Sequence, residues 1–268
     1  MRKTIRTLVI ILGLLFMYAP IVILAVYSFT DATTIGAIRG FSLANYITLF
    51  TTSELGQMIW GTVALALGSA VIATVLGTAG AIGAFYSKKR INQVFGIVNQ
   101  VPVVNADVVT GFSLCILLVV VFGISKDTFI PLVIGHVTLS VPFVYLSVVP
   151  KLKQMDPSLY EAALDLGASP AVALRKIIIP QISAGIVSGF AMSITLSLDD
   201  YFIATYTKPA TFDTISTYVV NATRGSHTEI KTALWALSTV IFLIVLCVAI
   251  GMNIYRKKND GDERRAAV

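Results

Sequence analysis

The chain of 268 residues is 56% hydrophobic and only 13% charged, and its mean hydropathy is +0.84. These values lie outside the range of soluble globular domains and favour a membrane protein. The net charge of +6 is compatible with a nucleic-acid partner, so the positions of the charges have to decide between the two interpretations.

Six apolar stretches are long enough to cross a hydrocarbon core, which takes about 20 helical residues. They are continuous and rich in Leu, Ala and Gly rather than alternating, so they predict helices and not barrel strands. Cys115 and Cys247 lie inside apolar stretches, which indicates neither a disulfide nor a metal site. We expect one all-α domain over residues 1–268, with spans at about 8–28, 60–86, 94–123, 129–149, 182–206 and 233–255.

The first span is predicted to be an uncleaved anchor. Its apolar core from Leu8 to Tyr27 is longer than the 7–15 residues of a signal-peptide core, and no convincing cleavage site follows it. In the second span Ala73, Gly77 and Ala81 recur at i+4 steps, a small-residue face that lets helices approach closely in lipid. Packing within the chain and packing in a dimer both explain this face.

The third span is predicted to be broken. A continuous helix over residues 91–123 would be about 50 Å long, too long for one crossing. Pro102 removes an N–H and favours a break, so we expect a short leading helix and a kink near Asn99–Asn105 before the crossing. Broken backbone at membrane depth is tolerated where it is buried or lines a wet cavity, so the kink is a candidate element of a pathway. His136, in the fourth span, is interpreted as a packing residue.

The charged segment between the fourth and fifth spans predicts two short helices that meet at a tight corner. Asp156 is a good N-cap before Pro157, Gly167 suits a left-handed C′ position, and Ser169-Pro170 repeats the cap and N1 pair. The first of these helices carries an apolar stripe and two acidic residues one turn apart, Glu161 and Asp165. A solvated loop and a docking element for a basic partner are both consistent with this pattern. The stripe comprises Leu159, Ala162, Ala163 and Leu166.

The run Glu161-Ala162-Ala163, followed by Gly167 and then by Arg175 to Pro180, resembles the EAA loop of ATP-binding-cassette (ABC) importer permeases. Ile179 and Gln181 depart slightly from that pattern. The similarity extends from about Met58 to Tyr255 and is closest to the spermidine/putrescine permeases of the PotC type, notably in the Asp199-Asp200 region.

This resemblance implies a type I ABC importer permease fold with a cytoplasmic coupling-helix loop at 151–180, which docks into a separate ATPase. It implies a PotB-type second permease subunit in a heterodimer, two cytoplasmic ATPase subunits and an external substrate-binding protein as partners. The chain has no Walker-type phosphate-binding loop, so we expect no cofactor in it, with ATP and Mg on the partner ATPase. The implied coupling residues are Glu161, Ala162, Ala163, Asp165, Gly167, Arg175 and Pro180.

Carboxylates in or beside the spans are the candidate pathway residues, because a carboxylate at the bilayer centre costs about 2.5–3.5 kcal/mol and usually faces a cavity or a cation. Asp107, Asp199 and Asp200 are of this kind, and Tyr201 adjoins them. Staggered carboxylates could bind a polycation at successive weak sites. Two plainer interpretations stay open: Asp199 and Asp200 end the fifth helix, paired with Lys208 or Arg224, and Asp107 caps the helix after the kink.

The charges are distributed as the positive-inside rule requires. Fifteen of the 20 Lys and Arg residues fall on one side of the predicted spans, which places both termini and the loop at 151–180 in the cytoplasm and leaves no need for a nucleic-acid partner. Arg175 and Lys176 either pair within that loop or meet anionic headgroups. The predicted location is the bacterial cytoplasmic (inner) membrane, as a multi-pass protein in the lipid bilayer.

Three functions are compared. The resemblance implies a transport subunit, not an enzyme, that forms half of a polyamine pathway in an ATP-driven importer. An intramembrane aspartyl protease is the first alternative, although no Gly-x-Gly-Asp motif surrounds either Asp. An ion-coupled secondary transporter is the second, and it usually shows inverted repeats, which are not evident here. HExxH and GxSxG motifs are absent, and no catalytic or metal-binding residues are predicted.

Overall fold

The computed structural model describes residues 2–32, 40–156, 158–224, 232–243 and 246. Within these residues the regular elements are helices, apart from one isolated antiparallel bridge between Thr30 and Phe41. The predicted all-α class is therefore confirmed. The chain divides into two units, residues 1–56 with 219–268 and residues 57–218.

The first unit contains α1 (Arg2–Ser28), α2 (Ala44–Thr51) and an apolar helix over Thr232–Leu243. Tyr27 at the end of α1 meets Trp235 edge to face, with 5.5 Å between ring centroids. Asn45 in α2 donates its side-chain amide to the carbonyls of Ser28 and Thr30, at 3.1 and 3.0 Å. These bonds satisfy carbonyls at the end of α1, which a helix terminus would otherwise leave without partners.

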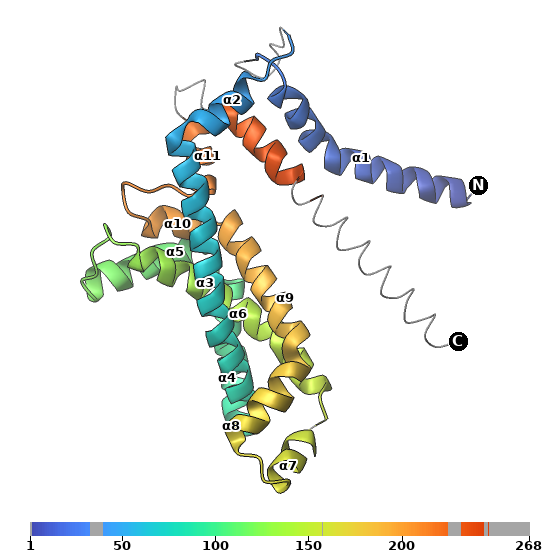
Figure 1. Cartoon of the computed structure of the whole chain (residues 1–268), viewed down its shortest axis with the longest axis vertical. Coiled ribbons are helices and arrows are strands. Elements are labelled where there is room, and N and C mark those ends of the chain that lie inside the picture. The colour runs from blue at the N-terminus through green and yellow to red at the C-terminus, as the bar shows by residue number, and fades with distance from the viewer. Residues whose placement is uncertain (1, 33–39, 157, 225–231, 244–245, 247–268) are drawn as a thin grey trace. The chain divides into compact units, whose positions relative to one another are not determined.

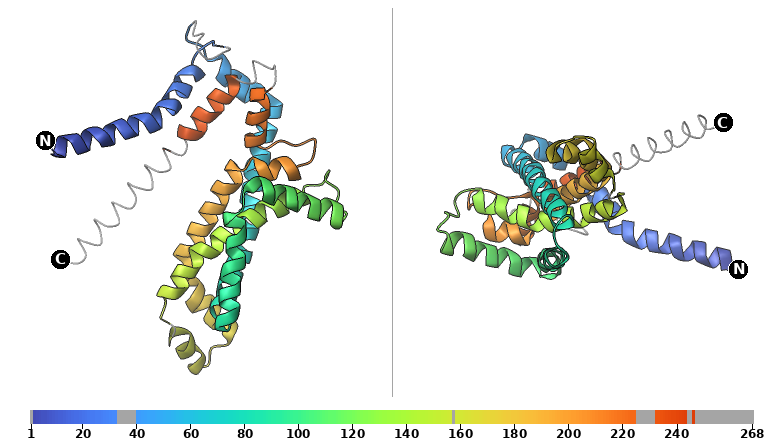
Figure 2. Two further views of the ribbon diagram at one scale, coloured as in Figure 1. Left: turned by 180° about the vertical axis from the view of Figure 1, so that it is seen from behind. Right: turned by 90° about the horizontal axis from the view of Figure 1, so that it is seen from below.

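The second unit carries the features that concern function (Figures 1 and 2). Two of its helices cross the boundary between the units: α3 begins in the first unit and α11 ends there. The helices in chain order are α3 (Ser53–Phe85), α4 (Lys89–Val104), α5 (Asp107–Cys115), the π-helical η1 (Ile116–Val121), α6 (Ile130–Gln154), α7 (Ser158–Asp165), α8 (Pro170–Ala173), the π-helical η2 (Leu174–Ile178), α9 (Ile179–Asp199), α10 (Phe202–Thr207) and α11 (Ile215–Arg224).

Helices α6 and α9 lie side by side and make the most extensive contact in this unit (Figure 1). Two glycines of α9 allow the close approach. A Cβ on Gly185 would lie 2.8 Å from the carbonyl oxygen of Ser147, and one on Gly189 would lie 3.0 Å from the Cα of Val144. Gly185 and Gly189 form a Gly-x-x-x-Gly face that packs within the chain, where dispersion between close backbones replaces the hydrophobic effect.

Among the described residues, four helices are long and apolar enough to cross a membrane: Arg6–Ser28, Ser53–Phe85, Ile130–Gln154 and Pro170–Asp199. The pair Lys89–Val104 and Asp107–Val121 makes a fifth if it counts as one span, and it is bent by 102°. The predicted sixth span, 233–255, lies partly outside the described residues, so the count of six crossings stays a prediction.

Three predicted spans differ from the observed helices. The second begins at Ser53 instead of 60. The third span does break, but α4 passes through Pro102 and ends at Val104, so the break falls at Asn105–Ala106. The fifth helical segment begins at Pro170 instead of 182, because α8, η2 and α9 are continuous. It ends at Asp199 instead of 206, because Asp200 is extended, with φ −66° and ψ 124°.

Candidate functional site: a coupling segment and an acidic corner

Of the two short helices predicted in the coupling segment, residues 151–180, only α7 is short. The second begins at Pro170 as predicted, but it is the first part of the continuous helix made by α8, η2 and α9. Asp156 accepts hydrogen bonds from the backbone N–H and the hydroxyl of Ser158, at 2.9 and 2.8 Å, and these bonds hold the pKa of its carboxyl below the usual value. Pro157 lies outside the described residues. At the second helix Ser169 is extended and Pro170 occupies the first turn of α8. The hydroxyl of Ser169 makes no capping bond.

Gly167 forms the corner between α7 and α8 in the left-handed conformation, with φ +85°. Its N–H donates to the carbonyl of Leu164 at 2.9 Å, and the N–H of Ala168 donates to the carbonyl of Ala163 at 3.0 Å. This pair of bonds closes the end of α7 and satisfies carbonyls that the helix leaves open. Glycine adopts such a φ without the steric cost that a Cβ imposes.

Only part of the apolar stripe on α7 is covered by the chain. Ala163 is buried and Leu159 packs against the core below it, whereas Leu166 is 89% exposed. Glu161 and Asp165 are exposed, and in the described residues no ion pair joins them to Arg175 or Lys176. The end of α7 therefore presents one large apolar side chain and two free carboxylates.

Pro180, the last predicted coupling residue, lies in the first turn of α9. The π-helical turn η2, which contains Arg175, directly precedes α9. A proline inside a helix removes one hydrogen bond and crowds the preceding turn, and a locally wider turn accommodates this. The coupling segment thus passes into α9 without a loop (Figure 1).

The acidic corner, Asp107, Asp199 and Asp200, brings together carboxylates that are far apart in the sequence. Asp107 is in the first turn of α5 and is exposed, and α5 packs against α10, the helix that directly follows Asp199 and Asp200. Helices α5 and α10 pack closely here, since a Cβ on Gly111 would lie 3.0 Å from the Cα of Ile203.

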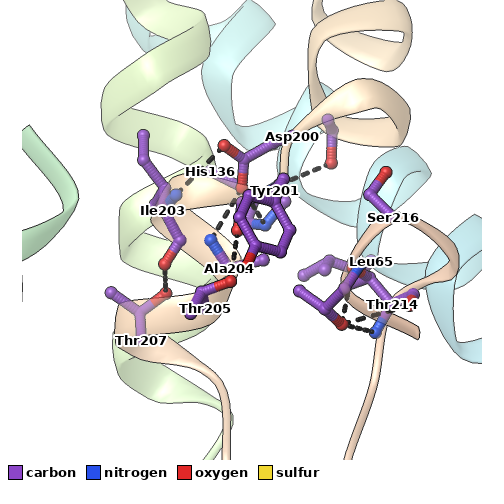
Figure 3. A network of polar contacts seen from close by, with 12 residues as sticks. Leu65, His136, Asp200, Tyr201, Ile203, Ala204, Thr205, Thr207, Thr214 and Ser216 are labelled. Atoms are coloured by element: carbon purple, nitrogen blue, oxygen red, sulfur yellow. Dashed lines mark hydrogen bonds and ion pairs between the residues drawn. The ribbon is translucent and has the colours of Figure 1, made fainter. Parts of the chain in front are cut away.

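Asp199 and Asp200 are adjacent but have different surroundings. Asp199, the last residue of α9, is exposed, whereas Asp200 is only 8% exposed. The carboxylate of Asp200 accepts the backbone N–H groups of Ile203 and Ala204, at 3.1 and 2.7 Å, at the start of α10 (Figure 3). Asp200 therefore caps the helix that follows it.

The first plainer interpretation is correct about the helix end, since α9 ends at Asp199, but the pairing of these carboxylates with Lys208 is not formed. Lys208 instead contacts Asp213 at 3.1 Å and donates to the carbonyl of Phe212 at 2.8 Å. The side chain of Arg224 lies outside the described residues. Tyr201 is partly exposed beside the corner, and its ring meets that of Phe202 edge to face. The second plainer interpretation, that Asp107 caps the helix after the kink, is wrong, because Ala106 is the N-cap of α5 and no side-chain capping bond is formed there. Asn105 donates to the hydroxyl of Thr110 at 3.0 Å.

An open groove of about 430 Å³ lies between α6 and α9. Sequence reasoning missed Ser147, because Thr138 and Ser140 are further hydroxyl residues of the same helix and hydropathy singles out none of them. Ser188, Thr195 and Asp199 follow at i, i+7 and i+11, so they share one face of α9. This α6–α9 groove is lined by Phe143, Leu146, Ser147, Ser188, Ala191, Met192 and Thr195.

Long apolar helices together with exposed carboxylates at their ends and a groove that contains three hydroxyl groups are typical of a membrane transport component. Comparison with known proteins agrees. The family model for the inner membrane component of binding-protein-dependent transport systems matches residues 77–260. The chain belongs to this family, and it is therefore a multi-pass inner-membrane permease component and not itself an enzyme.

Individual relatives are similar along nearly the whole chain. The spermidine/putrescine transport system permease protein PotC of Haemophilus influenzae is 30% identical over 91% of this chain and 93% of its own length. The putrescine transport system permease protein PotI of Escherichia coli K12 is 31% identical over 88% of this chain and 85% of its own length.

Among solved structures, a crystal structure of a bacterial ABC transporter involved in the import of the acidic polysaccharide alginate is similar, with a TM-score of 0.71. The match covers 93% of this chain and 93% of that one, at 18% identity. At this identity the likeness establishes the fold, which is that of an ABC importer permease.

Proposed function

We propose that this chain forms half of the translocation pathway of an ATP-driven importer for a polyamine, spermidine or putrescine. The observation that carries the proposal is the similarity, over about nine-tenths of the chain, to permeases named for these two substrates. The negative charge of the acidic corner is complementary to such a substrate, because a polyamine carries several positive charges and the corner presents exposed carboxylates at Asp107 and Asp199.

The α6–α9 groove supplies a route toward the acidic corner. Hydroxyl groups of Ser147, Ser188 and Thr195 line it, and Asp199 lies on the same face of α9, one turn beyond Thr195. Hydroxyl groups and one exposed carboxylate bind an ammonium group weakly. Weak binding is suitable for a transport pathway, because the substrate has to be released from each site. In this proposal Asp107, Asp199 and Tyr201 contact the passing polyamine.

Energy enters through the coupling segment. The exposed end of α7 presents Leu166 with Glu161 and Asp165, a surface suited to a basic groove on a cytoplasmic ATPase subunit. The ATPase would supply ATP and Mg, and its movement would reach α9 directly, because α8, η2 and α9 are continuous. Two ATPase subunits, a PotB-type second permease subunit and an external binding protein complete the proposed assembly, with both termini of this chain in the cytoplasm.

Uptake by the reconstituted complex tests this function. Proteoliposomes that contain both permease subunits and the ATPases, with ATP inside and the binding protein outside, should accumulate labelled spermidine or putrescine. Omission of ATP should abolish accumulation. Uptake without ATP, or ATP-driven uptake of an uncharged or anionic solute in place of both polyamines, would contradict the proposal.

Asp199→Asn tests the pathway separately from the substrate. An exposed ion pair is worth about 0.5–1 kcal/mol, so loss of the charge should raise the KM for polyamine uptake roughly two- to fivefold. Asp127→Asn is the matched control, because Asp127 is an exposed carboxylate in the loop between η1 and α6. Equal KM values in the two variants would remove Asp199 from the pathway.

A further inference from the structure

His136 is a buried polar residue that lies outside the α6–α9 groove. Its side chain is 0% exposed, and its Nδ1 is hydrogen-bonded to the hydroxyl of Ser197 on α9 at 2.7 Å. Ser197 in turn lies 3.4 Å from the hydroxyl of Ser69 on α3. His136 therefore connects α6 to α9 and, through Ser197, to α3.

The other ring nitrogen of His136 faces the acidic corner. Nε2 makes no hydrogen bond within the described residues, and it lies 3.6 Å from the Oδ2 of Asp200 (Figure 3). In the tautomer in which Nδ1 accepts from the hydroxyl of Ser197, Nε2 carries the ring proton. A buried N–H without a partner is costly, and the carboxylate opposite reduces that cost. The position of Asp200 is thus favourable for His136 as well as for the start of α10.

Close packing of α10 on α6 beside His136 also fixes the bend between α9 and α10. A Cβ on Gly135 would lie 2.6 Å from the Cγ2 of Ile203, so α10 rests directly on α6 at the residue next to His136. Asp200 binds the N–H of Ile203. The chain bend between α9 and α10 is therefore fixed by a carboxylate at its centre, which contacts α10 on one side and faces His136 on the other.

We propose that His136 is a positioning residue for the transport pathway. With Asp200 it clamps the bend between α9 and α10 to α6, and this fixes where Asp199, one residue earlier, stands on the exposed face of α9. The two adjacent carboxylates then have different tasks: Asp199 meets the substrate, and Asp200 holds Asp199 in place. This inference rests on the proposed function of Asp199.

Three substitutions separate the contacts of His136. In His136→Asn the side-chain amide replaces Nδ1 and keeps the bond to Ser197, but nothing reaches Asp200. In His136→Gln the longer amide reaches the Nε2 position and keeps the contact with Asp200. His136→Leu fills a comparable volume without either polar contact, so it shows whether packing alone is sufficient.

The position of residue 199 can be measured by chemical labelling in the assembled complex. Cys115 and Cys247 are replaced by Ser, and Asp199→Cys is introduced with each substitution at His136. The rate of reaction with a cationic, membrane-impermeant methanethiosulfonate is measured on complexes that contain all subunits, at equal yield of assembly. We expect His136→Gln to match the parent, and His136→Asn and His136→Leu to change the rate about threefold or more.

Equal rates in all four proteins would overturn the inference, and so would a parental rate in His136→Leu, which would mean that packing suffices. Protection of Asp199→Cys by spermidine tests the proposed function independently. A rate that depends on His136 without spermidine protection would uphold the clamp and remove Asp199 from the pathway. Protection with rates that do not depend on His136 would uphold the pathway and refute the clamp.

Discussion

Gly167 is the residue on which the geometry of the coupling segment depends. Its φ of +85° costs an L-residue about 1–2 kcal/mol, although a Cβ there would meet no atom within 4 Å. Gly167→Ala should therefore shift the corner between α7 and α8 without a clash. We expect the number of ATP molecules hydrolysed per polyamine imported to rise, measured on reconstituted complex at constant protein amount.

Gly123 provides a matched control for this prediction. It also has a positive φ, +67°, and open space around its Cα, but it follows η1 and lies outside the coupling segment. Gly123→Ala should carry a comparable backbone cost and leave the ratio of ATP to substrate unchanged. The coupling role of Gly167 is refuted if both variants raise the ratio equally or neither does.

Asp156 makes the start of α7 sensitive to acid. Its pKa is lowered by the bonds from Ser158, so the carboxylate stabilises the folded segment fully above the unfolded value of about 3.9. That stabilisation is lost as the pH falls through the lower, folded pKa. Hydrogen exchange of the peptide over residues 155–166, corrected for the intrinsic rate, should show protection decreasing below about pH 4.

Asp156→Asn is the control for this pH dependence. An Asn side chain still offers an oxygen to Ser158 but does not titrate in this range. Protection in the variant should therefore be flat with pH. A decrease of the same size in both proteins would assign the effect to other carboxylates of the segment.

At the scale of elements, the closest contacts are made by small residues, and Gly77 on α3 is the clearest case. A Cβ there would lie 2.7 Å from the Cβ of Val144 and 3.0 Å from the carbonyl oxygen of Val141 on α6. Gly77→Ala should separate the two helices and destabilise the chain by about 1–3 kcal/mol. The measurement is the apparent Tm of the purified complex in detergent.

Gly80, less than one turn further along α3, has nothing within 4 Å of its ideal Cβ position. Gly80→Ala should leave the Tm unchanged or raise it, because Ala is a better helix former than Gly by about 1 kcal/mol. The pair separates a packing effect from a general effect of changing glycine in this helix. A lower Tm in Gly80→Ala of the same size would refute the packing argument.

Local chemistry explains which parts of the fold the sequence could predict. The corner at Gly167 follows from residues within a few positions of one another, a left-handed glycine and a Ser-Pro pair, so composition and spacing were sufficient. The fifth span drawn from hydropathy extends to 206 because residues 201–205 are mostly apolar, whereas the alternative interpretation, that Asp199 and Asp200 end the fifth helix, is confirmed. Hydropathy does not detect that Asp200 accepts the N–H groups at the start of the next helix.

Long-range contacts could not be predicted in the same way. His136 was correctly taken as a residue within the packed helices, but its partner Ser197 is 61 positions away in the chain. Which faces of two helices meet depends on the rotation of each helix, and the close approach at Gly185 and Gly189 decides it here. The grouping of Asp107 with Asp199 and Asp200 likewise depends on the packing of α5 against α10.

The topology of the whole chain is the remaining question, because it decides on which side the coupling segment lies. Fifteen of the 20 Lys and Arg residues lie on the side of the spans that carries this segment, so both termini should be cytoplasmic. An even number of crossings is required for that arrangement. In the part of the chain that the structure describes there are four long apolar helices, or five with the bent pair, and Thr232–Leu243 is apolar but short.

Reporter fusions after residue 268 distinguish these possibilities. With six crossings, a C-terminal green fluorescent protein should fluoresce and a C-terminal alkaline phosphatase should be inactive, because only the first folds in the cytoplasm. A fusion of the same reporters within the loop after η1, at Asp127, should give the opposite result. An active phosphatase at the C-terminus together with an inactive one at Asp127 would place the coupling segment outside, where no ATPase could reach it, and would rule out the proposed energy source.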